Sequence, residues 1–187
     1  MNYNSPIRIE LPSIFGMKTV NAYLFTDPEP ILIDCGEKTD KSWEVLTGAL
    51  QEHGLSIKDL SKLIITHAHV DHCGAAAKVC EESNAKILYP MYAKGWALDL
   101  DEMREQRIKL IKDTLTHYQV PKDSLLAQTF AKILYAFRDF WDPIPEERLG
   151  FFQDQDILEM GGKVWEVIYT PGHCINQCCF YQEETQE

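Results

Sequence analysis

The first part of the chain alternates between apolar and polar positions. Ile7–Leu11 and Val20–Phe25 follow the period of two that is typical of half-buried strands, and Ile31–Ile33 is a short apolar run that predicts a buried strand. Asp40–His53 then carries apolar residues at helical spacing, and Gly54 is placed to end that helix. This order predicts a group of strands followed by a helix.

The next segments continue in the same way. Leu63–Thr66 is an apolar run that predicts a strand, residues 74–82 begin with small residues and predict a helix, and Ala85–Tyr89 predicts a further strand. Strands that alternate with helices in this way are typical of an α/β layer architecture.

Residues 91–143 interrupt the alternation. Asp99–Tyr118 has apolar residues in helical register, and Ser124–Trp141 has an unusually aromatic stripe at the same spacing. We expect an inserted pair of helices that pack against each other and against the domain. A lid over a functional site and a dimerisation surface are the alternatives for this segment.

The α/β pattern resumes after the insertion. Asp156–Met160 and Lys163–Tyr169 flank Gly161 and Gly162, which predicts a β-hairpin with a two-residue turn. A last strand ends at Tyr181. We therefore expect residues 1–187 to form one domain with a helical insertion at 91–143.

Composition narrows the classes of function. The 187 residues are 45% hydrophobic, which is enough for one packed core, and the formal charge of −11 argues against a nucleic-acid-binding surface. No apolar run reaches the length of a membrane span, and the N-terminus lacks the pattern of a signal peptide. The six cysteines are scattered and do not form a disulfide framework. These features favour a cytoplasmic protein that acts on a small molecule.

One short stretch concentrates the chemistry. His67, His69, Asp71 and His72 follow the apolar run at Leu63–Thr66. In an extended chain, positions i and i+2 point the same way, so His67 and His69 can bind one cation together. Asp71 and His72 come where the chain turns into a helix and can face a second ion beside the first. A surface histidine cluster without function is the simpler alternative, but packing does not need such a group.

The ligand types indicate which metal is expected. Nitrogen and oxygen ligands without thiolate suit zinc, iron or manganese better than a structural cysteine-based zinc site. His173 also follows a predicted strand, within Thr170-Pro171-Gly172-His173, and is the expected next ligand. Its neighbour Cys174 is expected to pack rather than to bind metal.

Asp34, His53 and His117 are expected to have roles other than metal binding. Asp34 directly follows the buried strand Ile31–Ile33 and needs hydrogen-bond partners, so it either braces the histidine segment or caps the next loop. His53 lies at a predicted helix end, where a cationic side chain is favourable. His117 is far from the other histidines in the sequence and is expected to be exposed to solvent.

Taken together, the motifs resemble the metallo-β-lactamase superfamily. The resemblance rests on His-x-His-x-Asp-His after an apolar strand and on the later Thr-Pro-Gly-His, and it extends to 33–36 and 158–162. It implies an αββα sandwich with a dinuclear site on one edge, as in glyoxalase II-like and lactonase-like metallohydrolases. It also implies that His67, His69 and His173 hold one Zn²⁺ and that Asp71 and His72 hold a second, with iron or manganese possible.

The resemblance is incomplete at the C-terminal end. Family members usually have a later Asp that bridges both metals and one further His, and neither residue type occurs after His173 here. We therefore expect this chain to be the N-terminal portion of a longer polypeptide, with a shortened family member as the alternative. The sandwich is expected to be incomplete at its C-terminus.

The resemblance also implies an activity. A metal-bound hydroxide would attack a thioester, a lactone or a related ester, and Asp71 would hold the nucleophile and relay its proton. An acyl-bearing small molecule is the expected substrate, and a homodimer through the insertion or an exposed sheet is the expected assembly. An iron-dependent oxidoreductase similar to sulfur dioxygenases is one alternative, and a non-catalytic metal-binding fragment is another. The chain alone is expected to be poorly active.

Overall fold

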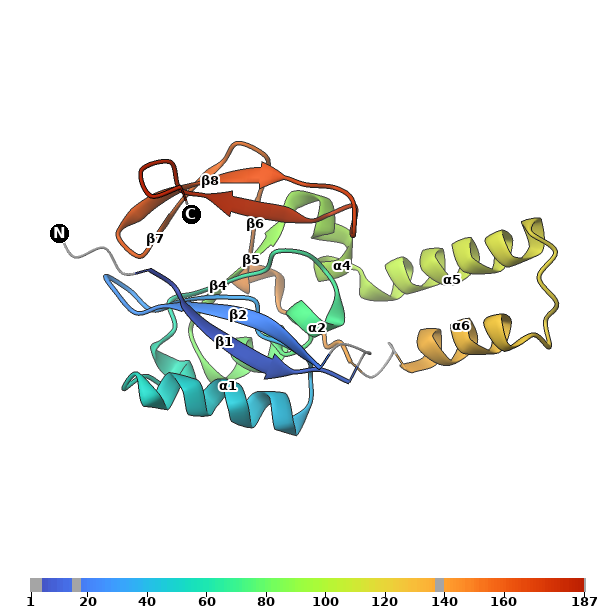
Figure 1. Cartoon of the computed structure of the whole chain (residues 1–187), viewed down its shortest axis with the longest axis horizontal. Coiled ribbons are helices and arrows are strands. Elements are labelled where there is room, and N and C mark those ends of the chain that lie inside the picture. The colour runs from blue at the N-terminus through green and yellow to red at the C-terminus, as the bar shows by residue number, and fades with distance from the viewer. Residues whose placement is uncertain (1–4, 15–17, 137–139, 187) are drawn as a thin grey trace.

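The computed structural model describes residues 5–14, 18–136 and 140–186. Two β-sheets lie one above the other, and helices lie below the larger sheet (Figure 1). The strands are β1 (Ile7–Pro12), β2 (Thr19–Phe25), β3 (Ile31–Ile33), β4 (Lys62–Ile64), β5 (Lys86–Pro90), β6 (Leu149–Phe152), β7 (Ile157–Met160), β8 (Lys163–Tyr169) and β9 (Cys178–Tyr181). The α-helices are α1 (Asp40–Glu52), α2 (Val70–Cys73), α3 (Ala76–Glu82), α4 (Lys94–Leu98), α5 (Leu100–His117) and α6 (Leu125–Ala136). The 3-10 turns are η1 (Ile57–Asp59), η2 (Met91–Ala93) and η3 (Glu146–Arg148).

The larger sheet places the ends of its central strands at one edge. Its order is β1-β2-β3-β4-β5-β6, antiparallel from β1 to β3 and parallel from β3 to β6. Parallel neighbours need a crossover connection, which α1 provides between β3 and β4, and α2 with α3 between β4 and β5. The carboxyl ends of β3 and β4 therefore meet at the same edge, where ligand sites of open α/β sheets form.

The core has two layers because successive residues of a buried strand face opposite ways. Leu32 of β3 packs into the cluster between the large sheet and the helices, whereas its neighbours Ile31 and Ile33 pack into the cluster between the two sheets. Leu46 and Leu50 of α1 are fully buried on the helix side. Burial of a leucine side chain contributes roughly 1.5–3 kcal/mol, so this helix is held mainly by packing.

The smaller sheet has the order β7-β8-β9 and is antiparallel throughout. Gly161 and Gly162 connect β7 to β8 with φ values of 62° and 72°. Two consecutive positive φ values define the hairpin turn that favours glycine, so the predicted hairpin is confirmed. Trp165 and Val167 of β8 face the larger sheet and are buried, whereas Val164 on the other face is exposed.

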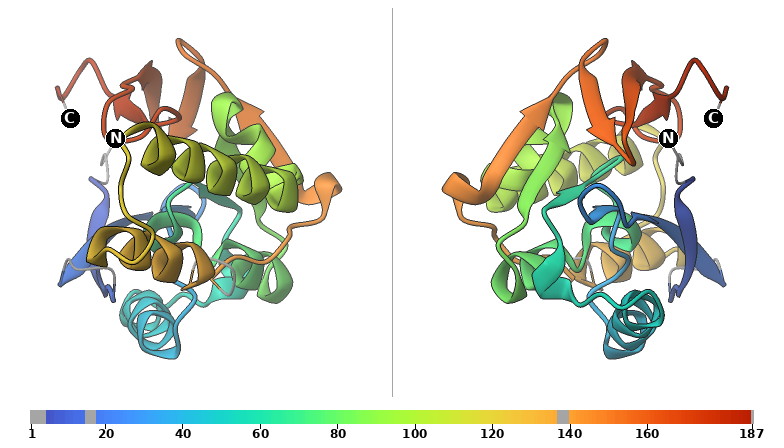
Figure 2. Two further views of the ribbon diagram at one scale, coloured as in Figure 1. Left: turned by 90° about the vertical axis from the view of Figure 1, so that its right-hand side faces the viewer. Right: turned by 90° about the vertical axis from the view of Figure 1, so that its left-hand side faces the viewer.

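The segment between β5 and β6 contains a helical hairpin that projects from the body of the molecule (Figures 1 and 2). No residue of α5 is buried, and Leu100 at its start packs against the core, so the expected packing against the domain is confirmed only at that end of the helix. The apolar positions of α5 are only half-buried at Met103 and Ile111, and Leu110 is 66% exposed. The sequence pattern identified one face of the helix, but that face is only partly covered.

The helical hairpin is held to the body of the molecule by packing at its base. Trp141 is buried and stacks on Trp96 with ring centroids 5.1 Å apart. Phe130 in the aromatic stripe is half-buried, and Phe137 lies outside the described residues. The buried Trp141 and its stacking partner Trp96 therefore stabilise the junction of this segment with the domain.

Candidate metal centre

The histidine segment begins where β4 ends. The chain stays extended through His69, which has φ −93° and ψ 144° and precedes the first turn of α2. Val70 and Cys73 face inward from this short helix and are buried, which turns Asp71 and His72 toward the site. At Gly74 a Cβ atom would lie 2.4 Å from the Val70 carbonyl oxygen and 2.9 Å from the Lys38 backbone nitrogen. Glycine therefore allows α2 to pack directly against the loop that follows β3.

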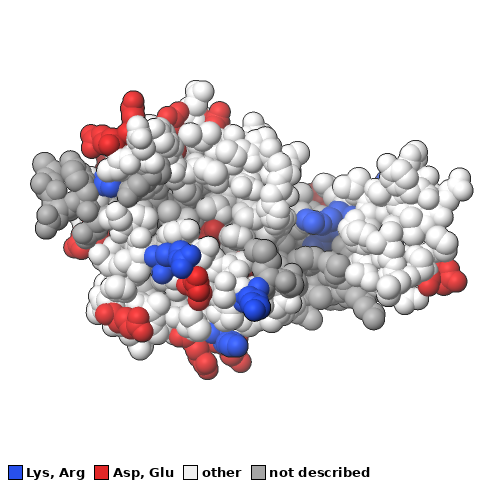
Figure 3. Space-filling model, in the orientation of Figure 1, with Lys and Arg blue, Asp and Glu red and all other residues white. Residues whose placement is uncertain are grey.

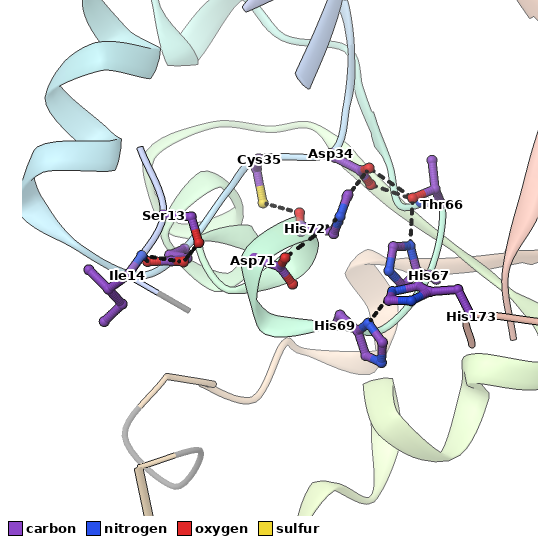
Figure 4. A network of polar contacts seen from close by, with 11 residues as sticks. Ser13, Ile14, Asp34, Cys35, Thr66, His67, His69, Asp71, His72 and His173 are labelled. Atoms are coloured by element: carbon purple, nitrogen blue, oxygen red, sulfur yellow. Dashed lines mark hydrogen bonds and ion pairs between the residues drawn. The ribbon is translucent and has the colours of Figure 1, made fainter. Parts of the chain in front are cut away.

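Three histidines converge at the sheet edge. His67, His69 and His173 each offer one ring nitrogen, and these nitrogens all lie within 4.8 Å of one another (Figure 4). Nδ1 of His69 and Nε2 of His173 are 3.0 Å apart. His173 comes from the connection between β8 and β9, so the group joins the two sheets. The group can hold a metal ion.

The hydrogen bonding of the two His67 ring nitrogens shows whether the site suits a metal ion. Nδ1 of His67 lies 3.0 Å from the hydroxyl oxygen of Thr66, which leaves Nε2 as the nitrogen available to the cluster. This Nε2 is buried and has no hydrogen-bond partner among the described residues. A buried polar atom without a partner costs about 1–3 kcal/mol, and coordination to a cation would satisfy it. The residues present therefore fit a metal ion.

Electrostatics keeps these rings neutral. Burial lowers the pKa of His67 to about 3, helped by the charges that His72, His69 and His173 would carry. Burial and the neighbouring His173 likewise lower the pKa of His69 to about 4. Neutral imidazole is the form that binds metals, so both lone pairs are available at neutral pH.

Asp34 braces the histidine segment, as the first of its two interpretations predicted. Its side chain is buried, and its backbone has a φ of 57° at the turn after β3. One carboxylate oxygen accepts the Thr66 backbone N–H at 2.8 Å, and the other accepts the Thr66 hydroxyl at 2.8 Å and Nδ1–H of His72 at 2.7 Å. Asp34 thereby fixes the residues on both sides of the first two histidines (Figure 4).

Asp71 and His72 lie beside the three-histidine group. The ring of His72 has its centroid 4.2 Å from that of His67, and its Nε2 is 3.9 Å from a carboxylate oxygen of Asp71. Burial alone would lower the pKa of His72, but the hydrogen bond and charge of Asp34, together with Asp71, raise it. The structure thus brings all five predicted site residues together, three in one group and two adjacent to it.

The remaining histidines and the neighbouring cysteine agree with their simpler interpretations. His53 and His117 are exposed at the ends of α1 and α5. Cys174 is half-buried, and its thiol donates to the side-chain oxygen of Asn176 at 3.1 Å. None of these three belongs to the group of metal-binding geometry found among the described residues.

The sequence did not indicate three residues that support the site. Thr66 links Asp34 to His67, and the buried Asn176 contacts the histidine segment from the other sheet. Glu37 is fully buried, and its carboxylate accepts the Ile14 backbone N–H at 3.0 and 3.1 Å, which ties the loop after β1 to this edge. Each role depends on a partner distant in the sequence, so no local pattern marks it.

The fold and the site together define a class: a two-sheet α/β protein with a histidine group at the strand ends where the two sheets meet. The metallo-β-lactamase superfamily matches residues 16–186 of the sequence, and the chain belongs to that superfamily. The predicted family and fold are therefore confirmed. Among the described residues, no helix combines the length and the hydrophobicity that crossing a membrane requires.

Individual relatives are distant and longer. The probable metallo-hydrolase YqjP of Bacillus subtilis (strain 168) is 22% identical over 185 residues, which are 99% of this chain and 56% of the relative. The metallo-β-lactamase family protein TTHA1429 of Thermus thermophilus superposes with a TM-score of 0.76 at 24% identity, over 96% of this chain and 56% of that one. The metallo-β-lactamase GOB-18 of Elizabethkingia meningoseptica gives a TM-score of 0.61 at 22% identity, again over 96% and 56%. The chain thus spans a little over half the length of these relatives.

Proposed function

We propose that the protein is a metal-dependent hydrolase. In this proposal His67, His69 and His173 hold one divalent ion, and Asp71 and His72 hold a second. The observation that carries it is the convergence of three ring nitrogens within 4.8 Å, one of them buried without a partner among the described residues. Zinc is the metal that these nitrogen and oxygen ligands favour, and iron and manganese are compatible with them.

In this proposal Asp71, Asp34 and His72 have different roles in the reaction. Ions held in such a site polarise a carbonyl group and lower the pKa of a water molecule. Asp71 has a half-buried carboxylate next to His72, where it can accept a proton from an attacking water and pass it to the leaving group. Asp34 holds Nδ1–H of His72, so Nε2 of that ring keeps its lone pair for the site.

We further propose a small ester-like substrate, namely a thioester, a lactone or a related acyl compound. The net charge of −11 disfavours a polyanionic substrate. On the face drawn in Figure 3, Lys and Arg side chains lie in separate small groups, whereas nucleic-acid binding requires a continuous basic surface. A small acyl substrate is compatible with both features.

Self-association is a further part of the proposal. The helical hairpin exposes several large apolar side chains, and the outer face of the smaller sheet exposes others: Leu110, Tyr118, Leu125, Leu126, Val164 and Ile168. Apolar side chains exposed in this number favour contact with another protein surface. A homodimer through the hairpin or the smaller sheet would cover some of them.

The proposal is tested by measuring metal binding and hydrolysis on the same preparation. Metal-free protein is titrated with Zn²⁺ in a calorimeter, and release of thiol or acid from thioester and lactone substrates is followed before and after loading. We expect binding of at least one ion and slow hydrolysis that depends on it, with both strongly reduced in His67→Ala. Metal binding that is unchanged in His67→Ala would contradict the site, and a fully loaded protein without hydrolysis of any ester would contradict the activity.

A further inference from the structure

The backbone between the first two histidines is held from the opposite sheet. The N–H of Ala68, a residue that is 3% exposed, donates to the side-chain oxygen of Asn176 at 3.1 Å. Asn176 is 1% exposed and lies in the connection between β8 and β9. A buried backbone N–H must find an acceptor, and here a single side chain supplies it.

A second contact holds the other side of His67. The carbonyl oxygen of Thr66 accepts the backbone N–H of Cys178 at 3.1 Å, and Cys178 begins β9. His67 therefore lies between two cross-links to the same connection that carries His173. The two contacts differ in origin. The Thr66 carbonyl oxygen accepts the backbone N–H of Cys178 and also its thiol at 3.3 Å, whereas the Ala68 N–H depends on the side-chain acceptor of Asn176.

The amide of Asn176 is also oriented. Its oxygen accepts a second donor, the thiol of Cys174, at 3.1 Å. Two donors that converge on one atom require an oxygen there, because an NH2 group would face both of them with its own hydrogens. The side chain is thus fixed with its acceptor toward the histidine segment, and Cys174 directly follows His173 in the chain.

We propose that Asn176 is a positioning residue, which holds the segment of His67 and His69 in place relative to His173 before a metal ion binds. The inference rests on the proposed function, since it takes these three histidines as the ligands. In this role Asn176 acts through the backbone of Ala68 and the thiol of Cys174, and not as a metal ligand.

Preorganisation of this kind affects metal affinity more than it affects the fold. Without the acceptor, the Ala68 N–H loses its side-chain partner, and the two loops are joined near His67 by the Cys178 contact. Nδ1 of His69 and Nε2 of His173, now 3.0 Å apart, are then free to separate. Loss of a group that orients metal ligands typically weakens metal binding about 10–100-fold.

Three variants of the whole chain test this role. Asn176→Leu keeps the branched shape and removes the acceptor, whereas Asn176→Asp keeps an acceptor oxygen. Gln177→Met is the matched control, because it makes the same change from amide to alkyl at the next residue, whose buried side-chain oxygen has no hydrogen-bond partner among the described residues. Affinity for Zn²⁺ and Co²⁺ is measured by calorimetry, and thermal unfolding of each metal-free protein is measured by circular dichroism.

We expect Asn176→Leu to bind the first ion about 10–100-fold more weakly, while Asn176→Asp and Gln177→Met bind close to the unaltered chain. Equal affinity of Asn176→Leu and the unaltered chain would overturn this inference and leave the proposed function standing. Equal losses in Asn176→Leu and Gln177→Met would also overturn it, because they would indicate general damage to the loop. If Asn176→Leu does not fold, the Zn²⁺ affinity of Asn176→Asp provides the test. An affinity close to that of the unaltered chain supports the positioning role of Asn176, and a large loss of affinity overturns it. Absence of metal binding by the unaltered chain would overturn both proposals.

Discussion

Replacement of Asp34 by Asn removes one negative charge with almost no change in size. Asn tolerates the left-handed backbone conformation found here, φ 57°, better than most residues do, so added strain is small. The remaining oxygen can still accept the Thr66 backbone N–H, now 2.8 Å away. The oxygen that becomes an NH2 group is the one that accepts the Thr66 hydroxyl and Nδ1–H of His72.

These two contacts respond differently to the change. The Thr66 hydroxyl can accept instead of donating, so its contact survives. Nδ1–H of His72 cannot face an NH2 group, so the ring must shift its proton to Nε2, the nitrogen that would bind the second ion. A hydrogen bond to a charged group, which contributes about 1.5–3 kcal/mol, is thus replaced by a neutral one that contributes about 0.5–1.5 kcal/mol. We therefore expect Asp34→Asn to lower the free energy of unfolding by about 1–2 kcal/mol.

The loss of stability in Asp34→Asn should depend on pH, and its direction follows from the pKa of His72. The pKa of His72 is raised because Asp34 and Asp71 outweigh the effect of burial. A raised pKa in the folded state stabilises the protein below the unfolded value of about 6.5, and this contribution disappears as the pH rises through the higher folded value. Without the Asp34 charge most of the effect is lost, so the difference between Asp34→Asn and the unaltered chain should be larger at a pH of about 5.5 than at about 8.5.

Urea unfolding of the metal-free proteins, followed by tryptophan fluorescence, measures both effects. Asp113→Asn is the control, because Asp113 is exposed on α5 and pairs with Lys109 at the surface, where solvent screens the pair and its loss should change stability little. An Asp34→Asn protein as stable as the control would refute the assigned role of the carboxylate. A difference that grows with pH would refute the link to His72.

Three smaller predictions concern other parts of the molecule. In a zinc titration, the ion at Asp71 and His72 should bind more weakly than the first, because the described residues offer it two ligands instead of three, and a single tight two-ion step would contradict this. Glu29→Gln should cost under about 1 kcal/mol at neutral pH and less at acidic pH, because the hydrogen bond to Lys62 lowers the Glu29 pKa and its contribution is lost as the pH falls through that lowered value. Urea unfolding at neutral and acidic pH measures the difference. Leu125→Lys should weaken self-association in sedimentation velocity, and equal association of both proteins would exclude Leu125 from the contact.

The sequence predicted the strands, turns and helices that depend on short-range patterns of apolar residues and glycines. The apolar run at Ile31–Ile33 and the glycines at 161 and 162 predicted a strand and a hairpin that the structure contains. The predicted helix at 74–82 is present as α3, which begins two residues later, and the motif itself forms the additional short helix α2 before it. Apolar spacing along α5 identified one face of a helix, but spacing cannot show that this face is only partly covered.

In the candidate site, too, the residues within local motifs were predicted, and those that act through distant partners were not. Four of its residues lie within one hexapeptide, and His173 follows a recognisable strand end, so their types and spacing were sufficient to predict the group. Thr66 and Asn176 were not predicted, because each acts through a hydrogen bond to a residue on another element. A lone Asn in a loop has no sequence pattern that distinguishes a buried acceptor from an exposed side chain.

Diffraction from zinc-loaded crystals of the chain, with anomalous data at the zinc edge, would locate the bound ions. We expect a peak roughly 2.0–2.1 Å from Nε2 of His67, Nδ1 of His69 and Nε2 of His173, with a weaker second peak beside Asp71 and His72. A strong peak elsewhere on the molecule, with these three rings free of metal, would contradict this expectation.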